Sequence, residues 1–295
     1  MTPDEFLIHR ERYLDSLAKQ NKSKHTVSAY RRDLAQLAAL LPEHPYEISR
    51  GDFVVVLRKL SQDNLSERSL KRKVSVWRQY GRYLVRNGLL ANNPAGRLKT
   101  PKPPERLPKA VDAEPLNALF DHAAAENPLD MRDIAIFELL YGCGLRVSEA
   151  CGLNISDILF SEGWVDVRGK GGKQRRVPLG RLAAAALRAY LPHRVAASGE
   201  DALFTNRFGR RISVRQIQYR LRDWAIKNGS PQHLSPHMLR HSYASHLLQS
   251  SGDIRAVQEL LGHSSLSSTQ IYTKLDFDHL VKVYDQTHPR AKTEK

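Results

Sequence analysis

Four side chains in the last quarter of the sequence have types and spacings that suit chemistry on a phosphate. His237 and Arg240 lie three residues apart, and the preceding Ser235-Pro236 pair is typical of a helix start. This spacing places both side chains on one helical face, near the positive end of the helix dipole, where an anion is stabilised. A guanidinium can hold phosphate oxygens through two parallel hydrogen bonds, and a tyrosine can attack the phosphorus. With His263 and Tyr272 further along, the pattern predicts a site that breaks a phosphodiester.

The composition favours a polyanionic partner. The chain has 295 residues, enough for two domains, with a formal net charge of +15 and a pI of about 9.9. Residues 1–110 hold 22 Lys and Arg against 11 Asp and Glu, whereas residues 111–295 hold 24 against 20. The N-terminal third is therefore the more basic part, which is typical of binding to nucleic acid or to an acidic membrane surface.

Several classes of protein are excluded by the same composition. No apolar run approaches the roughly 20 residues that a membrane span needs, and the N-terminus lacks the basic-then-apolar order of a signal peptide. Cys143 and Cys151 lie in an apolar, helix-like stretch and are expected to be buried, reduced thiols. These features predict a soluble, cytoplasmic protein.

The first hundred residues are expected to form a bundle of four helices. Thr2 and Glu5 fit a capping box ahead of the first apolar positions. Further helices are expected at about 25–41, 49–60 and 66–87. From Arg68 to Pro104 there is no acidic residue, so this run favours contact with DNA phosphates over a merely solvated helix face. The expected DNA contacts of the whole chain are Arg68, Lys71, Arg72, Arg78, Arg82, Arg175, Arg211 and Arg215.

A proline-rich segment divides the chain. The division predicted is an N-terminal DNA-binding domain at 1–99, a linker at 100–109 and a second domain at 110–295. At about 3.1 Å per residue the linker reaches roughly 30 Å, enough for two domains to hold a duplex from opposite sides, although an ordinary spacer fits the pattern equally.

The second domain is expected to be mainly helical with one small sheet. Helices are expected at about 113–124, 130–141 and 146–152. Residues 164–168 and 175–179 alternate like two strands of a hairpin, and Lys170 lies in the glycine-rich turn between them. That turn lacks the residue order of a phosphate-binding loop, so nucleotide binding is not expected.

Five short motifs, GLRVSE, GKGGKQR, HMLRHSYASH, LLGH and TQIYT, occur in an order that resembles the tyrosine recombinases, the phage integrase family. The stretch SSGDIRAVQELLGHSSLSSTQIYTKLDF, together with VYDQTHPRA near the end, resembles the bacterial Xer type of that family. The resemblance implies a SAM-like four-helix core-binding domain followed by an α+β catalytic domain. The residues that match the family's catalytic pattern are Arg146, Lys170, His237, Arg240, His263 and Tyr272.

The resemblance and side-chain chemistry together give each catalytic residue an expected role. Arg146 and Arg240 hold the phosphate, and Tyr272 is the nucleophile that forms a 3′-phosphotyrosine. Lys170 gives a proton to the leaving 5′ oxygen, while the two histidines donate hydrogen bonds or move the tyrosine proton. No metal or cofactor is expected, because the phosphotyrosyl ester conserves the energy of the bond. Glu149 is expected to orient Arg146 or a neighbouring residue. On the helix of His237, the residues His241, Tyr243 and His246 are expected to be core or supporting residues.

The tail carries an apolar stripe on a helix expected at about 276–287, formed by Phe277, Leu280, Val281 and Tyr284. This helix either folds onto its own domain or, as the resemblance implies, docks on a neighbouring recombinase protomer. The resemblance further implies action on double-stranded DNA at a dif-like site, in a heterotetramer with a XerD-like recombinase and under an FtsK-type DNA translocase, to resolve chromosome dimers. The alternatives are a phage or mobile-element integrase, a type IB topoisomerase and a DNA-binding protein without cleavage.

Overall fold

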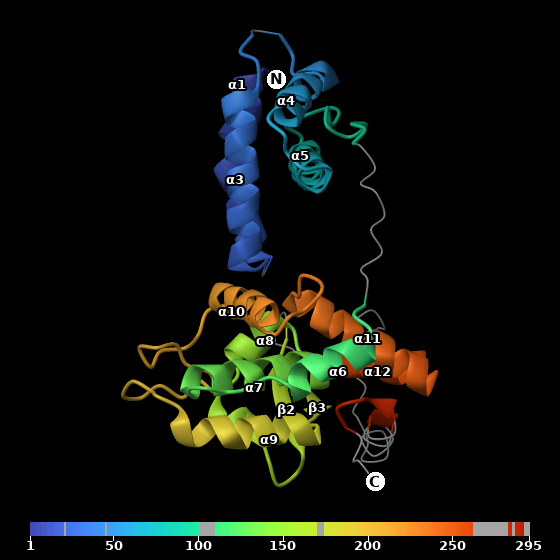
Figure 1. Ribbon diagram of the computed structural model, residues 1–295. Helices are drawn as coiled ribbons and strands as arrows, with labels where there is room; N and C mark the ends of the chain where they lie inside the picture. The colour runs from blue at the N-terminus through green and yellow to red at the C-terminus, as the bar shows by residue number, and fades with distance from the viewer. Residues whose placement is uncertain are drawn as a thin grey trace. The chain divides into compact units, whose positions relative to one another are not determined.

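The computed structural model describes residues 1–20, 22–44, 46–100, 110–169, 174–261, 283–284 and 287–291. The chain divides into two compact units, Met1–Glu105 and Arg106–Lys295 (Figure 1). Most of the proline-rich segment, at 101–109, lies outside the described residues. No helix in the part of the chain that is described is long and apolar enough to cross a membrane.

The N-terminal unit is helical, as predicted. Its helices are α1 (Pro3–Ile8), α2 (Arg10–Lys19), α3 (Lys24–Leu40), α4 (Arg50–Gln62) and α5 (Glu67–Arg86). The capping box at Thr2 and Glu5 is confirmed, and serines at 23, 49 and 66 cap the three later helices. The first expected helix is interrupted at His9, so its two halves form α1 and α2.

Aromatic side chains fill the core of this unit. Phe6 of α1 packs edge-to-face against Phe53 of α4 at 5.6 Å and against Tyr80 of α5 at 5.0 Å between ring centroids. Trp77 of α5 lies 5.9 Å from Phe53. Because the apolar face of α5 is buried in this way, most of its basic residues are left on the other faces of the helix. Lys73 is instead buried and pairs through Nζ with Asp33 Oδ1 at 2.7 Å.

The second unit surrounds one buried helix. Its helices are α6 (Ala113–Asp121), α7 (Pro128–Gly142), α8 (Val147–Gly152), α9 (Arg181–Tyr190), α10 (Val214–Lys227), α11 (Pro236–Ser251) and α12 (Ile254–Leu261). Short 3₁₀ turns occupy Ile155–Asp157 and Leu191–His193. Helix α7 is buried on nearly all sides and packs against α9, α10 and α11 (Figure 1). Both cysteines are free, but only Cys143 is buried; Cys151 is partly exposed.

The predicted hairpin is present in a three-stranded antiparallel sheet. Strands β1 (Ile158–Leu159), β2 (Trp164–Arg168) and β3 (Gln174–Pro178) pair in sequence order. In the pairing of β2 with β3, Val165 faces Val177 and Arg168 faces Gln174. Strand β1 was not expected, because two residues are too few to show alternation. A mainly α fold with a small antiparallel sheet is thus confirmed.

Candidate active site

Arg146 stands at the start of α8, directly after a tight turn. Gly144 ends the preceding segment with φ of +61°, a left-handed conformation that favours glycine. The chain can then reverse from α7 into α8, and the backbone N–H of Arg146 donates to Glu149 Oε2 at 2.7 Å. The Glu149 N–H in turn donates to the Arg146 carbonyl at 2.9 Å, and these two bonds fix the backbone from which the Arg146 side chain extends.

Glu149 joins two arginines through four hydrogen bonds. Its Oε1 accepts from Arg146 Nη1 and Arg175 Nη1, both at 2.8 Å, and its Oε2 accepts from Arg175 Nη2 at 2.8 Å as well as from the Arg146 backbone. The carboxylate side chain is buried. Burial raises the pKa of Glu149, but hydrogen bonds and charge from Arg175 and Arg146 outweigh it and hold the pKa at about 2. Glu149 is therefore ionised, and the expectation that it orients Arg146 agrees with this geometry.

Arg240 reaches the same carboxylate from α11. Its Nη1 lies 3.8 Å from Glu149 Oε2 and donates to the Gly144 carbonyl, while its Nη2 donates to the Leu261 carbonyl at 2.6 Å. Burial, followed by the charge of Arg146, lowers the pKa of Arg240 to about 10. The guanidinium remains protonated at neutral pH.

These contacts bring Arg146 and Arg240 together, although 94 residues separate them in the sequence. Three guanidinium groups share one carboxylate, so the cluster keeps an excess of positive charge. The Arg146 side chain is 41% exposed, so part of this charge is open to solvent. We call Arg146, Glu149 and Arg240 the arginine clamp; its geometry suits a bound phosphate.

His237, the first residue of the HMLRHSYASH motif, lies close to the arginine clamp in sequence. His237 is exposed in the first turn of α11, three residues before Arg240, and the predicted cap is confirmed by Ser235 Oγ, which accepts from the Met238 N–H at 3.4 Å. Lys170, His263 and Tyr272 lie outside the described residues, so their places in the site stay predictions. The strands on either side of the Lys170 turn are described, with Arg168 paired to Gln174.

The expected DNA contacts on α5 differ in how free they are. Four of them are exposed, namely Arg68, Lys71, Arg72 and Arg82. Arg72 is half exposed and pairs with the buried Asp33 of α3. Arg78 is partly buried and donates to the carbonyl of Leu98. Contact of these residues with DNA stays a prediction, and Arg68, Lys71 and Arg82 have the freest side chains for it.

The other three candidates lie in the second unit. Arg211 Nη1 donates to the carbonyls of Cys151 at 3.1 Å and Leu153 at 2.9 Å, so it braces the end of α8. Arg215 is exposed on α10 and donates through Nε to the hydroxyl of Tyr219 at 3.1 Å. Arg175 is mostly buried against Glu149. Strand alternation is the signal for that burial, because Arg175 shares a face of β3 with the buried Val177.

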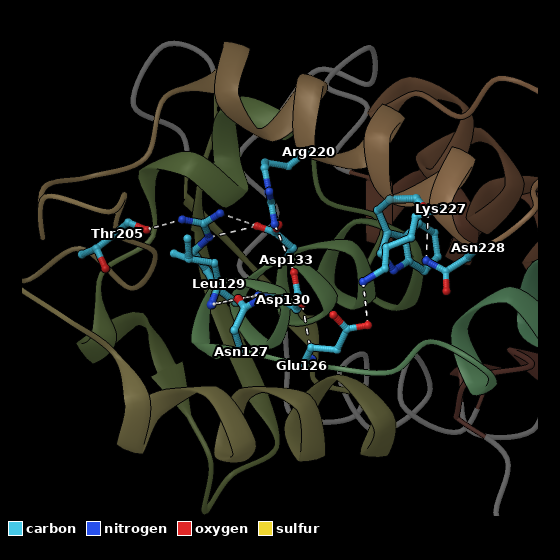
Figure 2. A network of polar contacts seen from close by, with 11 residues as sticks. Glu126, Asn127, Leu129, Asp130, Asp133, Thr205, Arg220, Lys227 and Asn228 are labelled. Carbon is cyan, nitrogen blue, oxygen red and sulfur yellow. Dashed lines mark hydrogen bonds and ion pairs between the residues drawn. The ribbon is translucent and has the colours of Figure 1, made fainter.

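A second polar network fixes α10 against α7 (Figure 2). The buried Asp133 accepts from Arg132 Nε at 2.9 Å and from Arg220 Nε, and Arg132 Nη1 donates to the Thr205 carbonyl at 2.8 Å. Arg220 also pairs with Asp130 at 3.2 Å. Burial raises the pKa of Asp133 even though both arginines act to lower it. The network sets the orientation of the helix that carries Arg215.

The last described residues pack on the second unit itself. His288 is fully buried, with its ring centroid 5.0 Å from that of Tyr243 and stacked on Tyr284 at 5.3 Å. Arg290 pairs with the buried Glu138 of α7 and with Asp121 at 2.6 Å. Tyr284, one member of the predicted apolar stripe, therefore lies in the core of its own domain. The other members of the stripe, Phe277, Leu280 and Val281, lie outside the described residues.

The chain combines a basic helical unit with a second unit whose arginine clamp is open to solvent. These features indicate a class of protein that acts on the phosphodiester backbone of nucleic acid. The chain belongs to the phage integrase family: residues 109–279 match its family model, and residues 11–88 match the N-terminal SAM-like domain of phage integrases. This confirms the resemblance drawn from the motifs, and with it a DNA strand-exchange enzyme as the activity class.

Individual relatives cover nearly the whole chain. The chain is 56% identical to "Tyrosine recombinase XerC" of Neisseria meningitidis serogroup C / serotype 2a, over 99% of each sequence. Among solved structures, it is 28% identical to XerA recombinase, with a TM-score of 0.50 over 96% of this chain and 98% of that one. A lambda integrase dimer bound to a COC′ core site gives a TM-score of 0.72 at 19% identity, over 92% of this chain and all of that one, and shows the shared fold.

Proposed function

We propose that this tyrosine recombinase is a XerC-type member of the Xer recombinases, and that it resolves chromosome dimers at cell division. In this proposal it acts in the cytoplasm on a dif-type DNA site, in a heterotetramer with a XerD-like recombinase and under an FtsK-type translocase. The proposal is supported by the 56% identity to the meningococcal XerC along the whole length. The single structural observation that carries the chemistry is the arginine clamp on one ionised carboxylate.

The clamp supplies the electrostatic part of the reaction. When an alcohol attacks a phosphodiester, the pentacoordinate species carries more charge on its non-bridging oxygens than the ground state does. Arg146 and Arg240 would hold those oxygens, so their positive charge would stabilise the transition state more than the bound substrate. Glu149 lowers this charge only in part, because it is shared with Arg175.

The covalent steps are assigned to residues of the family pattern. The Tyr272 hydroxyl would attack the phosphorus, forming a 3′-phosphotyrosyl bond as the bond to the 5′ oxygen breaks. Lys170 would protonate that 5′ oxygen, and His237 or His263 would take the tyrosine proton or donate hydrogen bonds to the phosphate. A 5′ hydroxyl of another strand then reverses these steps, which rejoins the DNA and returns the tyrosine.

The two units would divide the work. Residues 1–99 would bind the duplex through the exposed basic residues of α5, and 110–295 would carry the chemistry, with the segment 100–109 as the linker between them. Phosphate contacts of this kind give affinity that falls as salt rises.

The test is a covalent adduct on nicked suicide DNA that carries a dif-like site. We expect an adduct with the wild-type protein and none with Tyr272→Phe, which keeps the ring but removes the nucleophile. No adduct on any such DNA would overturn the proposed function. Adducts on arbitrary sequence would instead favour a type IB topoisomerase, which relaxes supercoils without sequence preference.

A further inference from the structure

Arg175 makes a two-pronged contact that neither the activity nor the family match assigns. We propose that Arg175 is a positioning residue of the arginine clamp, acting on the scissile phosphate through Glu149 and not through its own contact with DNA. The inference rests on the proposed function insofar as Arg146 and Arg240 are taken to hold that phosphate. It replaces the expectation that Arg175 is a DNA backbone contact.

The geometry leaves Arg175 little means of reaching DNA. Both of its Nη atoms donate to Glu149 at 2.8 Å, and its side chain is only 11% exposed. Its remaining donor, Nε, is buried without a hydrogen-bond partner within the described residues. By contrast, Arg215 on α10 and Arg68 on α5 are exposed to solvent. To contact a phosphate, Arg175 would have to give up its two parallel hydrogen bonds to Glu149, which we call the fork.

The same fork determines where Glu149 points. Arg146 gives each Glu149 oxygen one hydrogen bond, and the two parallel N–H bonds from Arg175 give each oxygen a second one, which fixes the plane and direction of the carboxylate. In that fixed orientation, Oε1 meets Arg146 Nη1 and Oε2 meets the Arg146 backbone N–H. Arg175 therefore fixes the acceptor that holds the exposed guanidinium of Arg146.

Charge acts in the same direction as geometry. Arg175 neutralises part of the negative charge of Glu149, so less of that negative charge offsets the positive charge of Arg146 and Arg240. Without the charge of Arg175, the buried carboxylate of Glu149 would be balanced by Arg146 and Arg240 alone. The net positive charge of these two arginines would fall, and their attraction for phosphate would weaken. Both effects predict slower cleavage without weaker DNA binding.

Arg175 also ties together three elements that are far apart in sequence. Glu149 belongs to α8, Arg175 to β3 and Arg240 to α11. The fork is the contact by which the hairpin supports the clamp. A lysine at this position has a single ammonium group and cannot reproduce two parallel bonds.

The test compares Arg175→Gln and Arg175→Lys with Arg176→Gln. Arg176 is the adjacent residue on the opposite face of β3; it pairs with Asp166 at 2.8 Å, where both side chains are more than 40% exposed. Single-turnover adduct formation is measured on suicide DNA with an ordinary scissile phosphate and with a methylphosphonate, whose neutral methyl group removes the charge that the clamp neutralises. Half-site affinity and its salt dependence are measured in parallel.

We expect Arg175→Gln to slow cleavage of ordinary DNA by about tenfold to hundredfold, with half-site affinity within about twofold of wild type. On methylphosphonate DNA, the cleavage rate of the variant should be much closer to that of wild type. The neutral methyl group removes the phosphate charge that the weakened clamp would otherwise have to neutralise. Arg175→Lys should resemble Arg175→Gln, and Arg176→Gln should resemble wild type. Equal losses on both DNAs would show mere structural support, and weaker binding with a shallower salt slope would show a DNA contact; either result overturns the inference.

A measurement on the free protein separates this inference from the proposed function. With ¹³C-labelled glutamate, the pKa of Glu149 should rise from about 2 toward its usual value in Arg175→Gln and stay low in Arg176→Gln. An unchanged pKa in Arg175→Gln overturns the positioning role whether or not DNA is cleaved. An absence of adducts with the wild-type protein, together with a raised Glu149 pKa in the variant, would count against the proposed function alone.

Discussion

The ring of Tyr243 fills the space where a side chain on Gly144 would begin. A Cβ atom added to Gly144 would overlap that ring, and the residue has φ of +61°. The Gly144 carbonyl also accepts a hydrogen bond from Arg240. The turn that leads into α8 and the direction of the Arg240 guanidinium thus depend on one glycine.

Gly144→Ala is therefore expected to impair both stability and cleavage. The left-handed backbone alone costs an alanine about 1–2 kcal/mol, and displacement of Tyr243 adds to it. Urea unfolding measures the loss of stability, and adduct formation on suicide DNA measures the loss of activity. Gly163→Ala is the matched control, because Gly163 has φ of +73° but open space around its Cβ position. If both variants cleave equally well, the Gly144 turn does not set the clamp.

Glu149→Gln should make the protein less sensitive to acid while it weakens cleavage. Contacts with Arg175 and Arg146 hold the pKa of Glu149 at about 2, below its unfolded value near 4.5. The ionised carboxylate thus contributes stability above about pH 4.5 that is lost as pH falls toward 2. The amide has no such dependence, so the unfolding free energies of variant and wild type should converge as pH falls through this range. Parallel curves would contradict the ion-pair account.

His288 should make the folded state sensitive to mild acid. Burial, followed by electrostatic repulsion from His246 and Arg290, lowers the pKa of His288 from 6.5 to about 3. The unfolded chain takes up the proton first, so stability falls as pH drops from about 6.5 toward 3, by about 2 kcal/mol at pH 5.

Replacing this histidine tests the assignment. His288→Phe keeps an aromatic ring against Tyr284 and should remove about 2 kcal/mol of the difference in unfolding free energy between pH 7 and pH 5. The same change at the exposed His233 should leave that difference as in wild type. An unaltered pH dependence in His288→Phe would place the acid sensitivity elsewhere.

The pair of Arg290 and Glu138 is expected to be costly to break from one side. Arg290→Met leaves the carboxylate of Glu138 buried and unpaired, which should cost about 3–5 kcal/mol of unfolding free energy. The double variant Glu138→Gln, Arg290→Met should recover part of that loss. Arg176→Met, which breaks an exposed pair with Asp166, should cost about 1 kcal/mol or less. Equal losses for the two arginine variants would contradict the burial argument.

The elements that were predicted correctly carry local signals. Helices α1, α3, α4 and α5 of the first unit begin at a threonine or serine that caps the first turn. The hairpin shows alternation on both sides of a glycine-rich turn. The break at His9 gave no signal, since the apolar pattern continues across it. Local rules therefore predicted the elements better than their exact ends.

Contacts between distant segments account for what was missed. The contact of Arg175 with Glu149 could not be predicted, because the two residues lie 26 positions apart and no periodicity joins them. The burial of His288 against Tyr141 and Tyr243 likewise depends on how three distant segments fold together. Arg146 and Arg240 were assigned together from the family pattern alone; the carboxylate between them supplies the physical link.

The apolar stripe of the tail gives the last prediction, and the structure changes how it is tested. Removing residues 276–295 would also remove Tyr284, His288 and Arg290, which pack in the core, so loss of function would follow from unfolding alone. The double variant Phe277→Ser, Leu280→Ser changes the stripe and keeps those three residues in the sequence.

If the stripe docks on a neighbouring protomer, this double variant should bind a single half-site like wild type but lose cooperativity on paired sites. Gel-shift titrations with half-site and full-site DNA measure both quantities. If the stripe instead packs on its own domain, the variant should lose about 2–5 kcal/mol of unfolding free energy, and half-site binding should fall with it. Full cooperativity in a stably folded variant would show that these two side chains take no part in assembly.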